Sequence, residues 1–267
     1  MSVLRTISLG WGVQSWTLAA MVALKELPPV DYAIHADTTW EASGTYEHAR
    51  KWTTWLEDRG VSVITVQDKR AEVVASWSNS VSVNIPAFTV DKENGSEGQI
   101  RRQCTHDWKI MPIRKFLRDK LKEAGEPARP GVVETLLGIS LDEYTRMRDS
   151  DVAYIRHAFP LVDARLTRAD CVLWLERQGL PVPPKSACVF CPYKSITSWK
   201  ELKQVGGKDW ETAVAVDKAI RGRRPKVDLF VHPGRRSLPE AVRIPQDYGA
   251  EQLAFPDIPC DGGYCFF

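Results

Sequence analysis

The sequence lacks an excess of charge of either sign, a long hydrophobic run and a leader pattern. Its 267 residues include 36 Lys and Arg against 34 Asp and Glu, so no strong overall field draws the chain to nucleic acid. No apolar run reaches the roughly 20 residues that cross a bilayer, and no signal-peptide pattern opens the chain. We therefore expect a cytoplasmic protein with no membrane partner.

Cysteine is also scarce, with six residues in the chain, and no internal repeat is found. In a reducing compartment, such cysteines indicate metal or redox chemistry rather than structural disulfides. At 43% hydrophobic residues the chain can bury a full core. We expect one large domain with an appendage.

A Gly/Ser-rich turn occupies residues 8–15, between an apolar opening at residues 3–7 and a helical pattern at residues 14–25. A second apolar run, residues 31–36, ends in the polar pair Asp37-Thr38. Strand, turn, helix and strand in this order make a nucleotide-binding βαβ unit, whose turn holds phosphate on backbone N–H groups and hydroxyls. The turn lacks the Gly-Lys-Ser/Thr of a Walker loop and the glycine spacing of a dinucleotide fingerprint.

The turn resembles the PP-loop of ATP pyrophosphatases, in the branch that includes the PAPS and APS reductases. The usual form is Ser-Gly-Gly-x-Asp-Ser, and here residues 12–15 match its end with Gln14 in the place of the acid. That departure removes a charge near the phosphates. The resemblance implies a phosphate cradle made by Ser8, Gly10, Gly12, Gln14 and Ser15.

Polar residues follow the second expected strand. An acid at this place can hydrogen-bond a ribose or an adenine amino group; the alternative is a helix N-terminus whose acids favour the dipole. In the reductase-like branch, an Asp-Thr pair followed closely by Glu lies beside the nucleotide. The resemblance thus implies nucleoside contacts from Asp37, Thr38 and Glu41. We expect His35 to be packed within its strand.

A further strand is expected at residues 132–139, and its end carries Gly138 and then Arg146. Arginine at such a strand end can neutralise phosphate charge in a transition state. The resemblance places a similar Gly-Ile-x-x-x-Glu segment at the nucleotide.

Residues 101–113 contain Cys104 and Lys109 at the start of a helical pattern. Cationic side chains and a helix N-terminus favour the thiolate that metal binding or nucleophilic attack requires. The segment resembles the Cys-Cys-x-x-x-Lys-x-x-Pro-Leu stretch of APS reductases, with one cysteine of the pair replaced by Gln103 and the lysine one position later.

The pair Cys188 and Cys191 forms a Cys-x-x-Cys motif, which is shared by zinc sites, iron–sulfur sites and redox pairs. With Cys104 it gives three soft ligands, and a three-cysteine [4Fe–4S] cluster is the arrangement of some PP-loop tRNA thiolation enzymes. A fourth ligand from Cys260 or Cys265 gives a closed cluster or a Cys₄ zinc site instead. Cys171 is expected to be a small core residue.

The last residues contain Cys260 and Cys265 around Gly262-Gly263. APS and PAPS reductases attack the sulfur of their substrate with a C-terminal cysteine in Glu-Cys-Gly-Leu-His, and that motif is absent here. The tail either delivers a thiol or is only a chain end. We take Lys109, Arg146 and Cys265 as the candidate catalytic residues.

Strand and helix patterns alternate over the first half of the chain, with a third strand at residues 61–66. This alternation predicts an α/β fold with a doubly wound, mostly parallel sheet and with ligand at the carboxyl ends of the strands. We expect a nucleotide-binding domain at residues 1–165, a helical cysteine-bearing cap at 166–225 and an irregular tail at 226–267. Residues 67–103 show less pattern, and the Gly-rich stretch 94–98 is expected to be a mobile loop over the site.

The resemblance as a whole implies an ATP pyrophosphatase that adenylates an acceptor and supports iron–sulfur-dependent sulfur transfer. ATP or adenylyl sulfate, Mg²⁺ and a [4Fe–4S] cluster (alternatively Zn²⁺) are the implied cofactors. A nucleic-acid acceptor and a sulfur donor such as a cysteine desulfurase are the implied partners. The alternatives are a reductase of adenylyl sulfate or its 3′-phosphorylated form, and a zinc-stapled nucleotide-binding protein without turnover.

Overall fold

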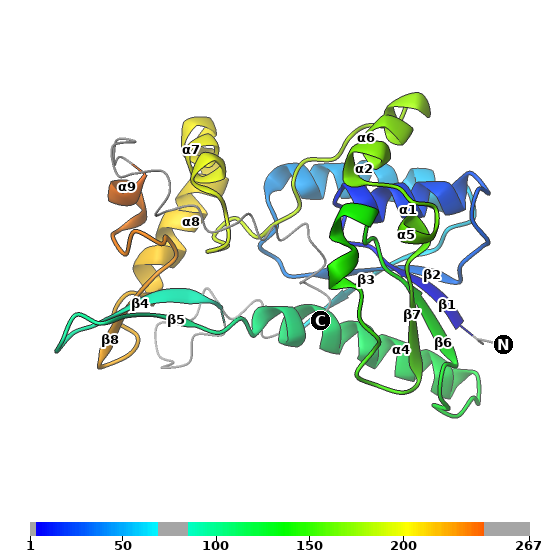
Figure 1. The fold of residues 1–267 in the computed structure, drawn as a ribbon, viewed down its shortest axis with the longest axis horizontal. Coiled ribbons are helices and arrows are strands. Elements are labelled where there is room, and N and C mark those ends of the chain that lie inside the picture. Colours follow the sequence, from blue (N-terminus) through cyan, green and yellow to red (C-terminus); the bar gives the residue numbers. More distant parts are fainter. Residues whose placement is uncertain (1–3, 69–84, 243–267) are drawn as a thin grey trace. The chain divides into compact units, whose positions relative to one another are not determined.

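The computed structural model describes residues 4–68 and 85–242, which form two compact units (Figure 1). The first unit contains residues 4–68 and 105–186, and the second contains residues 85–104 and 187–242. The chain therefore passes between the units more than once. This division differs from the three consecutive segments expected from the sequence, because residues 85–104 and 187–242 pack with each other although 82 residues separate them in the chain.

A five-stranded parallel sheet forms the centre of the first unit, in the order β3-β2-β1-β6-β7. Its strands are β1 (Leu4–Ser8), β2 (Tyr32–Asp37), β3 (Val63–Gln67), β6 (Val133–Leu136) and β7 (Ile155–Ala158). The order is doubly wound: the strand sequence reverses direction between β1 and β6, and such folds bind ligands at the carboxyl ends of the strands beside that reversal. The predicted α/β sheet is confirmed.

Helices cover both faces of this sheet (Figure 1). On one face pack α1 (Val13–Ala23), α2 (Ser43–Glu57) and α6 (Arg168–Arg177), over a core that includes Ile7 and Trp16. On the other face packs α4 (Met111–Glu123), over a core that includes Ile34 and Leu117. All eleven residues of α1 are buried, so this helix is enclosed by protein rather than amphipathic.

Three short segments complete the first unit. The six residues Thr105–Ile110 form a π-helical segment, η2, that runs directly into α4. A 3₁₀ segment, η3 (Leu141–Arg146), follows β6, and a single turn, α5 (Pro160–Asp163), follows β7.

The second unit contains a three-stranded antiparallel sheet in the order β5-β4-β8. The strands are β4 (Ala87–Asp91), β5 (Glu97–Ile100) and β8 (Val227–Phe230), and the helices are α7 (Ile196–Val205), α8 (Gly207–Ile220) and α9 (Leu238–Ala241). The three strands lie outside the segment expected to be a helical cap, residues 166–225, whose described elements are the helices α6, α7 and α8; the strands themselves were not expected from the sequence. These strands have only four or five residues each, too few for a clear period-2 pattern.

Two further expectations need correction in this unit. Residues 92–96 are the turn of the β4–β5 hairpin, where Asp91 Oδ1 accepts hydrogen bonds from the N–H groups of Glu93 (2.9 Å) and Asn94 (3.1 Å). The stretch after residue 225 is not irregular throughout, because β8 and α9 lie within it. Among the described helices, none combines the length and the apolarity that crossing a bilayer requires.

Candidate functional site

The turn after β1 leads into a helix whose N-terminus carries no side-chain cap. Gly10 donates its N–H to Ser15 Oγ (3.1 Å), and Ser15 Oγ in turn donates to the carbonyl oxygen of Gly12 (3.3 Å). Gly12 is the N-cap of α1, and the first turn of the helix contains no acidic residue. The first N–H groups of a helix need acceptors, and the helix dipole favours negative charge there. The turn is therefore built to receive an anion.

Ser8 lies at the carboxyl end of β1, directly before this turn. Its side chain is 3% exposed, and its Oγ is buried without a hydrogen-bond partner among the described residues. A buried hydroxyl without a partner costs stability, so its position indicates an acceptor that arrives with a ligand.

Gly138, just beyond β6, lies against the same turn. A Cβ placed on it would be 2.7 Å from the backbone nitrogen of Ser15 and 2.8 Å from its Cα. Real Cβ contacts do not reach such distances with backbone atoms, so only glycine fits here. The turn of residues 8–15 and the end of β6 thus meet at the reversal point of the sheet, and phosphate or nucleotide contacts from Ser8, Ser15 and Gly138 stay predictions.

Gln14 is held by a polar network of the first unit. Its Nε2 donates to Glu143 Oε2 (3.0 Å) and to Ser140 Oγ (3.3 Å), and its Oε1 accepts from a guanidinium nitrogen of Arg168 (2.9 Å). A carboxylate at residue 14 would face the carboxylate of Glu143, whereas an amide can donate to it. This explains the amide where the PP-loop pattern has an acid.

The network extends to the candidate catalytic Arg146, which is 7% exposed and forms an ion pair with Glu143 at 2.9 Å. Sequence reasoning did not select Arg168, which lies 154 residues from Gln14 along the chain. Arg168 is the first helical residue of α6, directly after the N-cap Thr167, which forms a complete capping box with Asp170.

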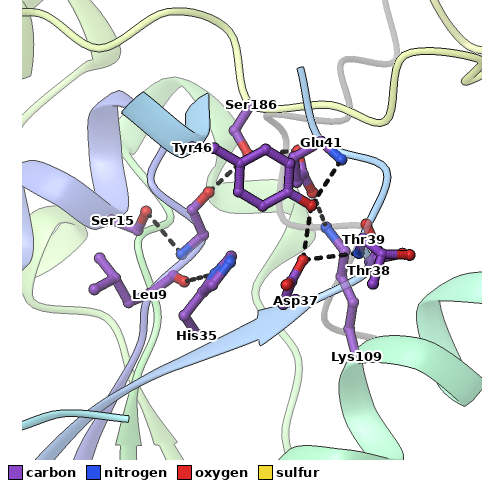
Figure 2. A network of polar contacts seen from close by, with 11 residues as sticks. Leu9, Ser15, His35, Asp37, Thr38, Thr39, Glu41, Tyr46, Lys109 and Ser186 are labelled. Carbon is purple, nitrogen blue, oxygen red and sulfur yellow. Dashed lines mark hydrogen bonds and ion pairs between the residues drawn. The ribbon is translucent and has the colours of Figure 1, made fainter. Parts of the chain in front are cut away.

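Figure 2 shows a second cluster, at the end of β2. Asp37 Oδ1 accepts hydrogen bonds from Tyr46 Oη (2.8 Å) and from the N–H of Thr39 (2.7 Å), and Tyr46 Oη accepts from the N–H of Glu41 (3.3 Å). Burial and the neighbouring Asp37 raise the pKa of Tyr46, which keeps its hydroxyl protonated as a donor. The carboxylate of Asp37 is thereby fixed in direction beside the reversal point.

Glu41 is more deeply buried than Asp37, with 1% of its side chain exposed. Its Oε1 lies 3.3 Å from Lys109 Nζ on η2, and its Oε2 lies 3.2 Å from Ser186 Oγ. Ser186 Oγ is also 2.7 Å from the carbonyl oxygen of Gly10 in the turn (Figure 2). Both carboxylate oxygens of Glu41 therefore have protein partners; a nucleoside contact from Glu41 stays a prediction, as do those from Asp37 and Thr38.

His35 is 6% exposed, with Nδ1 at 3.0 Å from the carbonyl oxygen of Leu9 (Figure 2). Burial is the main cause that lowers the pKa of His35, so its ring is neutral, and Nδ1 must carry the proton because a carbonyl only accepts. The expected packing role of His35 is confirmed.

The cysteines fall into two groups. Cys171 is fully buried on α6, and burial raises the pKa of its thiol to about 12, as fits the expected core residue. Cys104, Cys188 and Cys191 all belong to the second unit. Within residues 4–68 and 85–242, no three His, Cys, Asp or Glu side chains are grouped to hold a metal. Cys260 and Cys265 lie outside the described residues. Metal binding by Cys104, Cys188, Cys191 and Cys260 therefore stays a prediction.

No protein-family model matches the sequence, and no curated protein is significantly similar to it. Among solved structures, the chain is similar to a phosphoadenylyl-sulfate (PAPS) reductase from Candida auris in complex with phosphate. The match has 14% sequence identity and a TM-score of 0.44, and it covers 68% of this chain and 76% of the reductase.

Proposed function

We propose that the first unit binds the phosphates of an adenine nucleotide at the residue 8–15 turn, and that the chain is an enzyme of the PAPS reductase-like PP-loop kind. One observation carries this proposal: the N-terminus of α1 has no side-chain cap and no acid in its first turn, and it lies beside the buried Ser8 hydroxyl without a partner among the described residues. Three further features of the site support it: the close approach of Gly138, the reversal point of the sheet and the fixed carboxylate of Asp37.

The reaction that this arrangement favours is cleavage of ATP between its α and β phosphates. An acceptor oxygen forms a bond to the α-phosphorus, the bond from that phosphorus to the bridging oxygen breaks, and pyrophosphate leaves with the electron pair. The acceptor carries AMP, and its proton passes to solvent. N–H groups of α1 and the hydroxyls of Ser8 and Ser15 hold the phosphates, and Asp37 meets the nucleoside. Mg²⁺ bound together with ATP would supply charge neutralisation as pyrophosphate leaves.

In the second half of the proposed reaction, the terminal sulfur of a cysteine persulfide, supplied by a donor protein such as a cysteine desulfurase, bonds to the adenylated atom of a nucleic-acid acceptor. The bond from that atom to the AMP oxygen breaks, and AMP leaves with the electron pair. A second cysteine thiolate then attacks the inner sulfur of the former persulfide, which releases the thiolated acceptor and leaves a disulfide that an external thiol reduces. Cys104, Cys188, Cys191 and Cys260 are the residues proposed to serve this sulfur transfer. Because the described cysteines are not grouped to hold a metal, we assign no step to a cluster.

Two alternatives are separable by simple assays. A reductase of adenylyl sulfate or its 3′-phosphorylated form would release sulfite and would not convert ATP to AMP. A nucleotide-binding protein without turnover would bind ATP, retain zinc and release no pyrophosphate. Iron, sulfide and zinc analysis after anaerobic purification, together with a pyrophosphate assay, distinguishes the three.

The test of the nucleotide site uses Ser8→Ala. Removing a hydroxyl that has no protein partner should leave the thermal unfolding of the ligand-free protein unchanged or slightly improved. The same variant should bind ATP or adenylyl sulfate about 10- to 150-fold more weakly, because a hydrogen bond to a charged phosphate contributes about 1.5–3 kcal/mol. Calorimetric titration measures the affinity. Unchanged affinity in both Ser8→Ala and Ser15→Ala contradicts the site.

A further inference from the structure

Glu41 contacts one residue near each of two points where the chain passes between its units. We call the segments at these points, residues 105–110 and 185–188, the two passages. The chain re-enters the first unit at Thr105 and leaves it after Ser186. Lys109 is on η2, four residues after Thr105, and Ser186 is the last residue of the first unit before the chain leaves it. Both side chains contact the same carboxylate, at 3.3 Å and 3.2 Å.

The contacts of Glu41 differ in kind at its two oxygens. Oε1 forms an ion pair with Lys109, whose side chain is 15% exposed, so the pair is largely shielded from solvent and from salt. Oε2 accepts from Ser186 Oγ, whose other acceptor is the carbonyl oxygen of Gly10. The hydroxyl has one proton for two acceptors, so a displacement of Gly10 changes which of them receives it.

Lys109 and Ser186 lie 77 residues apart in the sequence, and between them the chain forms α4, β6, β7 and α6. Contacts between residues close in sequence cannot link the two passages, so the residue that links them must be distant in sequence from at least one of them. In Figure 2, Lys109 and Ser186 approach the carboxylate of Glu41 from different segments.

We infer that Glu41 is a positioning residue that connects both passages to the phosphate-binding turn. A change in the conformation of the turn then alters the two segments that lead to Cys104 and to Cys188. Lys109 holds one passage through its ion pair with Glu41. Ser186 holds the other, and its hydrogen bond to Glu41 depends on the position of the Gly10 carbonyl oxygen. In this role Glu41 acts through its protein partners, Lys109 and Ser186. The coupling to ligand rests on the proposed nucleotide site; the tying of the two passages does not.

Hydrogen–deuterium exchange on the ligand-free chain tests the tying. Glu41→Gln removes the charge that holds Lys109 and weakens the bond from Ser186, so amides 105–110 and 185–188 should both exchange about tenfold faster. Lys109→Met should accelerate only the first set, and Ser186→Ala only the second.

Glu134→Gln is the matched control. Glu134 is also a buried carboxylate of the first unit, 9% exposed, with two arginine partners, Arg5 and Arg156, on neighbouring strands. It touches neither passage, so its variant should leave both sets of amides unchanged. The inference is overturned if Glu41→Gln accelerates only one set or neither. It is also overturned if exchange rises uniformly over the first unit, which would mark Glu41 as an ordinary core residue.

Adding ATP tests the coupling. In the wild type, ATP should slow exchange at the turn and at both passages. In Glu41→Gln, ATP should still protect the turn, and the passages should no longer respond. If ATP protects the turn in neither protein, the proposed nucleotide site is contradicted. Exchange in the ligand-free chain then still tests whether Glu41 connects the two passages. If ATP protects the turn in both and the passages still respond in Glu41→Gln, the coupling is overturned.

Discussion

At the scale of single residues, two positions of the candidate site carry side chains that their neighbours explain: an uncharged amide at Gln14 and no side chain at Gly138. Gln14 stands in the place of an acid because Glu143 already supplies the carboxylate that it contacts at 3.0 Å. Gly138 has no Cβ because the backbone of Ser15 occupies that space. In both cases a neighbouring residue explains which side chain is present.

Gly138→Ala should weaken nucleotide binding without removing any polar group. The added methyl group must displace the backbone of Ser15, since neither partner is a flexible side-chain end. We expect a loss of affinity of about tenfold or more and a loss of stability of about 1–3 kcal/mol from overpacking. Calorimetric titration and denaturant unfolding measure the two effects.

Gly222→Ala is the matched control, because nothing lies within 4 Å of a Cβ at that position. It should change neither quantity. Equal effects of the two alanines would show that Gly138 has no special role at the turn.

At the scale of elements, α1 and α2 meet through aromatic rings that enclose a histidine. The ring of His48 lies 5.2 Å from Trp16 and 5.7 Å from Trp11, both edge to face, and 6.2 Å from Trp52. Burial is the main cause that lowers the pKa of His48 to about 4, and nearby Lys51 adds to it. The interface therefore favours the neutral imidazole over the charged form.

His48 should make the first unit sensitive to mild acid. Its pKa is lower in the folded chain than the ordinary value of 6.5, so the unfolded chain binds the proton first. Stability is then complete above about pH 6.5 and falls as the pH drops from there to about 4, by up to about 3 kcal/mol.

Denaturant unfolding at pH 7 and pH 4.5 measures the effect in the wild type and in His48→Phe. Other titrating groups are common to both proteins, so the difference between them isolates His48. An identical pH dependence in the two proteins would contradict the assignment.

The elements also show how far sequence reasoning extends. Strands β1, β2, β3 and β6 were predicted from buried apolar runs, and all lie within a few residues of their observed bounds. Strand β7 was missed because Arg156 and His157 interrupt its apolar pattern. The turn and Gly138 were found because they follow strands directly, whereas Arg168 and Ser186 reach the site through tertiary packing alone.

At the scale of the whole molecule, charge is divided unequally between the two units. In the described residues of the second unit, 14 Lys and Arg face 9 Asp and Glu, whereas the first unit has 19 against 20. The balanced total of the chain conceals this difference. An excess of positive charge on one unit favours a polyanionic partner.

A nucleic-acid acceptor should therefore bind through the second unit, with affinity that falls as salt rises. Arg224→Gln combined with Lys226→Gln should weaken binding and reduce the slope of log K against log salt by about one to two. Filter binding with tRNA and duplex DNA over a salt series measures this. Arg165→Gln with Arg177→Gln removes the same charge from exposed positions of the first unit and should have no effect. Equal losses from both pairs would rule out a dedicated surface.

The pairing of β4 with β8 has a consequence for synthesis. The hairpin of β4 and β5 leaves the ribosome early, whereas its third strand, residues 227–230, comes last among the described strands. The sheet of the first unit ends with β7, so its helices and strands are complete by residue 186. At about 5–20 residues per second, the open edge of β4 waits several seconds for its partner. A nascent chain must keep that edge from pairing with another chain, and the Asp91, Lys92 and Glu93 charges at the hairpin turn are placed to oppose such association.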